Sequence, residues 1–371
     1  MPEKRESMLY KENWEAAKKR LEALWSNEII DRCCVAIRAP KNNVKNRTGL
    51  YIKPAEHEEL VKYHTDPEYV LSRNIVEFES TYYGGEALPV LNPTWGDSGY
   101  AIYFNSNYKY SQRTTWFFPT IEDWEKDKVV FNEKTAQRHI SFVEEIAKNA
   151  KGKFLMSAPD YIGGADALIN LRGVENTLMD MIDVPEKFLE GLCEIRSAVK
   201  KVGSEFFKII NKACEGGSAW AWYDTWAKGS HNLVQCDFSA MISPQMFEEL
   251  ILPDLEENCS LLDCAVYHLD GREQLRHLDM ILSVPALKMV QWTNVAGQPS
   301  VLEFIPVFKK IQKAGKGLLL FTDMKQAEQL LGELSPEGLY LNAGWAESED
   351  EADRFIKKIE QKSIKKYQQP I

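Results

Sequence analysis

The sequence predicts an α/β fold, a single (β/α)8 barrel of the TIM type. Eight short apolar runs have the length of buried strands, and they lie near residues 35, 89, 155, 220, 266, 289, 319 and 340. Most are followed by a helical pattern, and strands that alternate with helices pair in parallel. Eight such units favour a closed barrel over an open sheet. No Pro/Gly/Ser-rich linker or shift in composition divides the chain, so we expect one domain over residues 1–371.

The amino-terminal half contains an opening helix and three of the predicted strands. Residues 8–27 carry apolar side chains at helical spacing with Lys and Arg between them, which predicts an amphipathic helix. We expect this segment, within residues 1–30, to pack on the barrel. The strands are expected at 33–39, 88–91 and 154–156.

In the carboxyl-terminal half, predicted strands and helices alternate more regularly. Helical patterns cover 174–182, 186–212, 243–262 and 349–362, and a strand is expected at 218–223. Residues 98–130 are rich in aromatic side chains and have no clear period, so whether they form a lid stays open.

Composition excludes several classes of protein. The net charge is −10, which disfavours a nucleic-acid partner because binding to phosphates needs a basic surface. No apolar run approaches the roughly 20 residues of a membrane span, and the charged first 20 residues are unlike a secretory signal. The seven cysteines form no CxxC pair and are expected to be reduced thiols. We therefore expect a cytoplasmic protein with no membrane partner.

The most informative segment is His268-Leu269-Asp270-Gly271, which follows the apolar run 264–267. An imidazole and a carboxylate would stand at the carboxyl end of a strand, where barrel enzymes carry their chemistry. The pair can bind a metal, act as a metal-free acid–base or substrate-binding pair, or only make structural hydrogen bonds. As a metal site it needs a third ligand, and Cys236 in a neighbouring loop is the candidate. Such a set suits zinc or iron.

Asp224 is the second candidate catalytic residue. Alternation along the predicted strand places Trp220, Trp222 and Asp224 on one face. A carboxylate beside indole rings is poorly solvated, so its pKa is expected to rise, which suits a general acid. The alternative is a helix or loop cap.

Other side chains at predicted strand ends are expected to contact the substrate. They are Asp160, Tyr161, Trp222, Trp226, Trp292, Asn342, Trp345 and, after the first strand, Arg38. No Gly-x-Ser-x-Gly, P-loop or Gly-x-Gly-x-x-Gly motif is present, which disfavours serine hydrolase, P-loop and dinucleotide chemistry.

Three segments between about 150 and 345 carry a family resemblance. They are Phe154–Pro159 continued by Gly173–Lys187, Trp222–Trp226 continued by Ile242–Pro253, and Tyr267–Gly271 with its preceding strand. They resemble the uroporphyrinogen decarboxylase superfamily, which also contains cobalamin-dependent methyltransferases that deliver methyl groups to thiols such as coenzyme M. The resemblance implies a (β/α)8 barrel with a deep cleft at the carboxyl ends of the strands.

The sequence also departs from that family's patterns. The decarboxylases grip their substrate's carboxylates with an arginine-rich amino-terminal segment, whereas Arg38 alone lies near that place here. The thiol methyltransferases use a His-x-Cys pair where this chain has His268-x-Asp270. They also have a second Cys after the last strand, where this chain has Asn342-Ala343-Gly344-Trp345. Two thiolates of a thiol-activating zinc site are therefore missing.

The leading hypothesis is methyl transfer between a corrinoid carrier, presented by a partner protein, and a small-molecule substrate. His268, Asp270 and Asp224 would polarise or protonate that substrate. Decarboxylation of a porphyrinogen or another carboxylate is the alternative. Glycoside hydrolysis by Asp224 and Asp270, with Trp222, Trp226 and Trp292 stacking on sugar, and a non-catalytic binding role also stay open. So does the assembly, for which a homodimer is a candidate.

Overall fold

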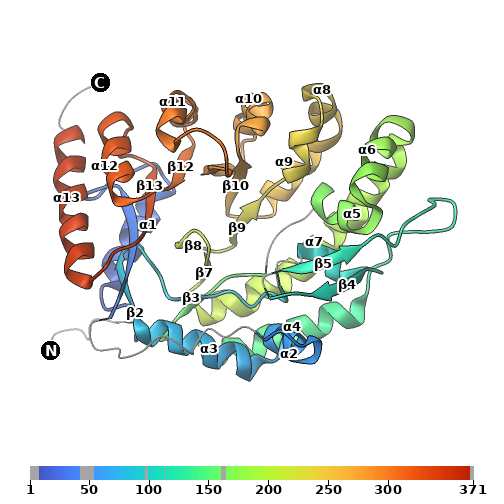
Figure 1. The fold of residues 1–371 in the computed structure, drawn as a ribbon, viewed down its shortest axis with the longest axis horizontal. Helices are drawn as coiled ribbons and strands as arrows, with labels where there is room; N and C mark the ends of the chain where they lie inside the picture. Colours follow the sequence, from blue (N-terminus) through green and yellow to red (C-terminus); the bar gives the residue numbers. More distant parts are fainter. Residues whose placement is uncertain (1–7, 42–53, 97–98, 113, 160–163, 368–371) are drawn as a thin grey trace.

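A computed structural model describes residues 8–41, 54–96, 99–112, 114–159 and 164–367. It confirms the mixed α/β architecture: helices surround a central, mostly parallel sheet of seven strands (Figure 1). In sheet order these strands are β2 (Thr81–Gly85), β1 (Cys34–Pro40), β13 (Leu339–Trp345), β12 (Gly317–Phe321), β11 (Leu287–Thr293), β10 (Cys264–Asp270) and β9 (His231–Val234). β2 alone runs antiparallel to its neighbour.

Further short strands form two-stranded sheets. They form the pairs β3 (Val90–Leu91) with β6 (Leu155–Met156), β4 (Asn107–Tyr110) with β5 (Thr115–Phe118), and β7 (Gly217–Trp220) with β8 (Thr225–Lys228). β7 joins β9 through the Ser218 hydroxyl, which accepts the His231 N–H, and joins β6 through a parallel bridge at Ser157 and Ala219. Within the described ranges the ladders do not complete a ring between β3 and β1. The sheet is compatible with the expected barrel, but its closure is not shown.

The helices cover the strands on the outside (Figure 1). They are α1 (Trp14–Leu24), α2 (His57–Thr65), α3 (Pro67–Ser80), α4 (Glu133–Ala147), α5 (Ala165–Arg172), α6 (Val174–Asp183), α7 (Pro185–Ala213), α8 (Pro244–Met246), α9 (Leu252–Ser260), α10 (Leu278–Ser283), α11 (Ile305–Lys313), α12 (Met324–Glu333) and α13 (Glu349–Tyr367). A 3₁₀ turn, η2 (Asp237–Met241), follows β9. Parallel strands covered by helices are buried on both faces, and β12 reads Gly-Leu-Leu-Leu-Phe accordingly.

The opening helix α1 packs against β8 and β1. Trp14 of α1 is fully buried, and its ring meets that of Trp226 on β8 edge-on at 5.5 Å. Trp25, just after α1, donates its indole N–H to the Trp226 carbonyl. Edge-to-face aromatic pairs are worth about 0.5–1.5 kcal/mol beyond their buried area, so this contact helps to fix α1.

The predicted strand at 218–223 is wrong in its second half. β7 ends at Trp220, and the chain turns back through 221–224 into β8. Asp224, the last residue of this turn, has a φ of 60°, a left-handed conformation that does not fit an extended strand. The alternation that placed Trp220, Trp222 and Asp224 on one face therefore does not apply.

Across the described part of the chain, every helix is too short or too polar to cross a lipid bilayer.

Candidate functional site

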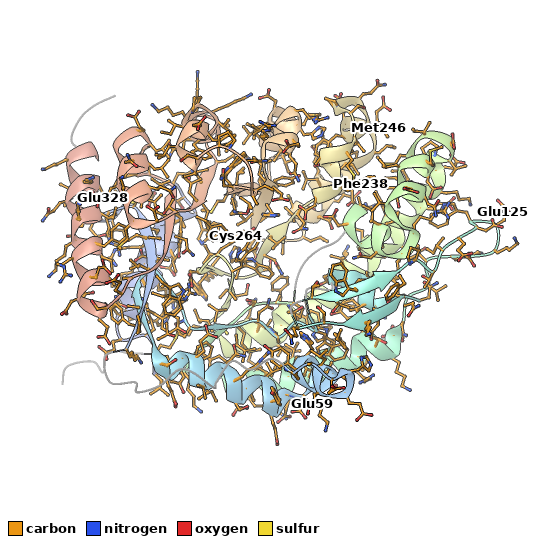
Figure 2. The ribbon with its side chains drawn as sticks, in the orientation of Figure 1. Glu59, Glu125, Phe238, Met246, Cys264 and Glu328 are labelled. Atoms are coloured by element: carbon orange, nitrogen blue, oxygen red, sulfur yellow. The ribbon has the colours of Figure 1, made fainter. Side chains whose placement is uncertain are left out.

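Three side chains converge at the carboxyl ends of β9 and β10. Asp237 is the first residue of η2 and is separated from β9 by Gln235 and Cys236, while His268 and Asp270 lie on β10. Leu269 between them is fully buried, as expected where successive side chains alternate across a strand. Phe238, labelled in Figure 2, marks the position of the segment that carries Asp237.

The three groups form a cluster with the size of a metal site. The Nε2 atom of His268 lies 3.9 Å from Oδ1 of Asp237 and 4.0 Å from Oδ1 of Asp270. One candidate ligand atom from each residue lies within 4.8 Å of the other two. These separations are too long for hydrogen bonds, so the imidazole nitrogen faces two carboxylates without a direct bond to either.

The other nitrogen of His268 is held in place. Its Nδ1 lies 2.5 Å from Oε1 of Gln291 on β11. An amide oxygen only accepts, so Nδ1 carries the proton and Nε2 keeps its lone pair. Burial lowers the pKa of His268, although the Gln291 bond and the Asp270 charge oppose this. A neutral imidazole with a free Nε2 lone pair is the form that binds metals.

Asp237 lies in an electrostatically unfavourable place for a carboxylate. Partial desolvation, together with the charges of Asp166 and Asp270, raises its pKa to about 8. Nearly half of its side chain is still exposed, so the carboxyl group lies open to solvent. A cation bound beside it would relieve the repulsion among the carboxylates.

One wall of the site is aromatic. Trp222 is 48% exposed, and its ring centre lies 5.1 Å from that of His268 and 5.4 Å from that of Phe321. The Tyr223 hydroxyl donates to Oε1 of Gln291. Of the Trp side chains expected to contact substrate, Trp222 is the one that the structure places against His268.

Asp166 of α5 contacts the segment that carries Asp237. Its carboxylate accepts the backbone N–H groups of Asp237 and Phe238 at 3.0 and 3.2 Å, and the Gln235 side-chain amide at 3.2 Å. The segment between β9 and η2 is thereby tied to α5.

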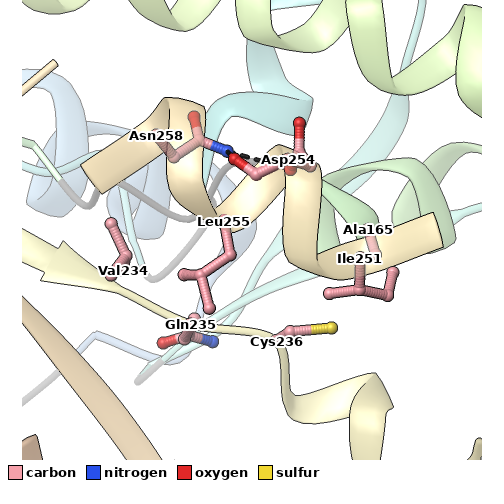
Figure 3. Close-up of a pocket in the computed structure, with 8 residues that line it drawn as sticks. All are labelled: Ala165, Val234, Gln235, Cys236, Ile251, Asp254, Leu255 and Asn258. Carbon is pink, nitrogen blue, oxygen red and sulfur yellow. Dashed lines mark hydrogen bonds between the residues drawn. The ribbon is translucent and has the colours of Figure 1, made fainter. Parts of the chain in front are cut away.

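Cys236 is not the third ligand of this cluster. Its side chain is buried and points into a small cavity of about 10 Å³ between the segment after β9 and the helix that carries Ile251 and Leu255 (Figure 3). That volume is roughly one water molecule. Burial raises the pKa of the Cys236 thiol well above its usual range, which favours the inert thiol. The next residue, Asp237, takes the place that the sequence assigned to Cys236.

Asp224 also lies outside the cluster. It is fully buried and forms a two-pronged ion pair with Arg38, at 2.6 and 2.5 Å. Its carboxylate also accepts the Leu88 N–H and the Asn342 amide. Burial raises the pKa of Asp224, but these four donors are the partners that an ionised carboxylate needs. Asp224, which the sequence predicted as a general acid, thus forms a buried ion pair in this structure, and both Arg38 and Asn342 donate hydrogen bonds to it.

The remaining aromatic candidates divide into buried and exposed ones. Trp226 and Trp292 are each 1% exposed; Trp226 packs on Trp14, and Trp292 packs on Phe304 and Phe308. Both rings belong to the buried core and are not exposed in this structure. Trp345 ends β13 and is 51% exposed. Asp160 and Tyr161 lie outside the described residues.

Comparison with known proteins adds a likeness in fold. A search of solved structures found a methyltransferase from Methanosarcina mazei. The match has a TM-score of 0.57 and 13% sequence identity, and it covers 93% of this chain and 98% of that one. The two chains share a fold. No model of a known protein family matches the sequence, and neither does any curated protein.

Sequence reasoning missed Asp237, Gln291 and Asp166. Asp237 follows a strand that begins with His231 and Asn232, both buried, so the strand was read as a loop. Gln291 gave a usable signal, since it is a polar residue within the apolar strand Leu287–Thr293. Buried polar side chains need partners, and in this case the partner is His268.

Proposed function

We propose that this chain is a metal-dependent, methyltransferase-type enzyme whose divalent cation binds Asp237, His268 and Asp270. The observation that carries the proposal is the approach of two carboxylate oxygens to the Nε2 lone pair of a neutral His268. A cation stabilises a lone pair that faces two carboxyl groups, because it favours the deprotonated form of Asp237, whose pKa is raised to about 8 without it.

The residues fit such an ion. Zinc binds His and Asp ligands at about 2.0–2.2 Å, which puts tetrahedral ligand atoms roughly 3.4 Å apart. The observed 3.9 and 4.0 Å need only small side-chain adjustments to reach that spacing. Three protein ligands leave a position for a substrate or water, as catalytic zinc sites do. Because two ligands are carboxylates, iron and manganese also suit the site.

The ion would act as a Lewis acid that favours the deprotonated form of a bound acceptor group. Gln291 would keep Nε2 of His268 directed at the ion, and Trp222 would shield one side of the bound group. The methyl carrier in this proposal is a corrinoid presented by a partner protein. In that transfer the acceptor would release a proton to solvent, its electron pair would form the bond to the methyl carbon, and the pair from the broken cobalt–carbon bond would stay on the corrinoid.

The charges around the site disfavour the porphyrinogen alternative. The side chains of Asp166, Asp237 and Asp270 offer no cationic partner to a substrate that carries many carboxylates. Arg38, the cation nearest to the family's arginine-rich segment, is already paired with Asp224. A small acceptor without carboxylates suits these surroundings better.

The test is an anaerobic assay of the purified chain. Metal content is measured after mild purification, and the metal-stripped protein is reloaded with Zn²⁺, Fe²⁺ or Mn²⁺. Demethylation of methylcobalamin is then followed by visible absorbance with a panel of thiol, hydroxyl and amine acceptors. We expect turnover that needs one equivalent of metal and stops with chelator. Binding of less than a tenth of an equivalent of every metal would refute the proposal.

A further inference from the structure

We infer that Asp166 is a positioning residue: its carboxylate fixes the segment 235–238 so that Asp237 faces His268, and it thereby sets the site's affinity for a divalent cation. The inference rests on the proposed function, because it concerns the same cation.

Both oxygens of Asp166 are used on this segment. Oδ2 accepts the N–H of Asp237 at 3.0 Å, and Oδ1 accepts the N–H of Phe238 at 3.2 Å. These N–H groups belong to the first residues of η2, where backbone donors lack partners within the turn. Charge-assisted bonds to such donors are stronger than neutral ones. The direction of the backbone at Asp237 therefore depends on Asp166.

The Gln235 side chain makes a second link. Its Nε2 donates to Oδ2 of Asp166 at 3.2 Å and to Oδ2 of Asp237 at 3.1 Å. The amide thus lies between the two carboxylates and holds one oxygen of Asp237. The other oxygen, Oδ1, is the one that lies 3.9 Å from Nε2 of His268. Asp166 consequently influences both the backbone and the side-chain orientation of Asp237.

Asp166 itself stands on a firmly packed element. α5 begins just after Gly164, which has a φ of 66° and comes so close to α9 that a Cβ there would lie 2.3 Å from Oδ2 of Asp254. Only glycine fits such an approach in that conformation. The start of α5 is therefore fixed against α9. Through its hydrogen bonds, Asp166 ties the segment 235–238 to this fixed part of α5.

The test compares cation affinities of the folded variants Asp166→Asn and Asp254→Asn. Asparagine keeps the size of the side chain but turns one acceptor into a donor that faces an N–H group. Partners of metal ligands typically contribute 10- to 100-fold in affinity, so we expect Asp166→Asn to weaken Zn²⁺ or Mn²⁺ binding by that factor. We also expect a changed visible spectrum of the Co²⁺-loaded protein, which reports coordination geometry.

Asp254→Asn is the matched control. Asp254 is another buried carboxylate at the contact between α5 and α9, but it bonds to Arg196 and Asn258 instead of the segment 235–238. It should cost stability and leave the affinity within about twofold. Should Asp166→Asn not fold, Gln235→Leu removes the amide link alone and should still weaken binding several-fold.

The outcomes separate the two proposals. A wild-type chain that binds no cation refutes the proposed function. A wild-type chain that binds, with Asp166→Asn binding equally well, refutes the positioning role and leaves the metal site standing. Equal weakening in Asp166→Asn and Asp254→Asn also refutes the positioning role, because the effect would then be a general loosening of the fold.

Discussion

Oε1 of Gln291 lies 2.5 Å from Nδ1 of His268, and this contact decides which imidazole nitrogen faces the carboxylates. The Gln291 amide nitrogen donates to the Thr293 hydroxyl, which orients the amide with its oxygen towards His268. A side chain on β11 thus selects the tautomer of a side chain on β10. Partners of this kind fix ring orientation and raise ligand basicity at metal sites.

Replacing Gln291 tests that relationship. Gln291→Leu removes the acceptor, so either tautomer becomes available and the buried Nδ1–H loses its bond. We expect cation affinity to fall about 10- to 100-fold. Gln291→Glu keeps an acceptor in the same place and should retain most of the affinity. Isothermal titration with Zn²⁺ measures both, and equal affinities of Gln291→Leu and wild type would contradict the assigned tautomer.

Asp270→Asn should lower enzymatic turnover while leaving the stability of the fold nearly unchanged. The Asp270 side chain is 35% exposed, so the change should alter the free energy of unfolding by only about 0.5 kcal/mol. Loss of a ligand should lower turnover on the order of 10²-fold, once an acceptor is known. Urea unfolding and the methylcobalamin assay measure the two effects. A large loss of stability would instead make Asp270 a structural residue.

Asp224→Asn should show the opposite pattern. It leaves the largely buried Arg38 guanidinium without its charged partner, and breaking a buried ion pair typically costs about 3–5 kcal/mol. Cation affinity should stay within about twofold, because Asp224 does not belong to the Asp237–His268–Asp270 cluster. The double variant Asp224→Asn with Arg38→Met should lose less stability than the sum of the single variants, since the two side chains interact directly. A strong loss of cation binding in Asp224→Asn would contradict this and would show that Asp224 contributes to the site.

Two buried imidazoles away from the site make stability depend on pH. Burial lowers the pKa of His139 to about 3 and that of His231 to about 4. An unfolded histidine titrates near 6.5, so between about pH 6.5 and 4 the unfolded chain binds protons that the folded chain does not. The stability contributed by the neutral rings is complete above about pH 6.5 and is lost as the pH falls towards 4.

Urea unfolding at pH 7, 6 and 5 measures this dependence. Each ring should contribute up to about 1.4 kcal/mol per pH unit in that range. His139→Asn should therefore flatten the slope by that amount, whereas the change His57→Gln at an exposed histidine should leave it unchanged. A slope that is the same in His139→Asn and wild type would show that His139 is not neutral in the folded chain.

Regular elements with a strong apolar period were predictable from the sequence. β1, β10, β12 and β13 contain continuous apolar runs, β11 is apolar except at Lys288, Gln291 and Thr293, and His268 and Asp270 lie at the carboxyl end of β10 as expected. Such runs identify strands because buried strands exclude unpaired polar groups.

β9 was missed because its polar residues are paired inside the protein. His231 bonds to Thr225 and to the Cys264 carbonyl, and Asn232 donates to the Pro159 carbonyl. None of these partners is near in the sequence, apart from Thr225. Since the segment was read as a loop, Asp237, which follows it after Gln235 and Cys236, was not recognised as a candidate site residue.

Trp292 shows a second limit of sequence reasoning. β11 is buried on both faces, so alternation along the strand does not tell which face points to a cleft and which to the surrounding helices. The Phe304 and Phe308 rings that cover Trp292 come from the segment after the strand and from α11. Only the tertiary packing identifies its ring as part of the core.

The three cluster residues come from two neighbouring strands, and this has a consequence for how firmly the chain holds together. Asp237 follows β9, His268 and Asp270 belong to β10, and the two strands share a ladder of residue pairs from His231–Cys264 to Val234–Tyr267. A cation held by all three would clamp the open end of that ladder. Because unfolding separates the ligands, a concentration 100 times the dissociation constant would add about 2.7 kcal/mol. The melting temperature of this chain would then depend on the trace metal in its buffer, and adding a chelator would lower it.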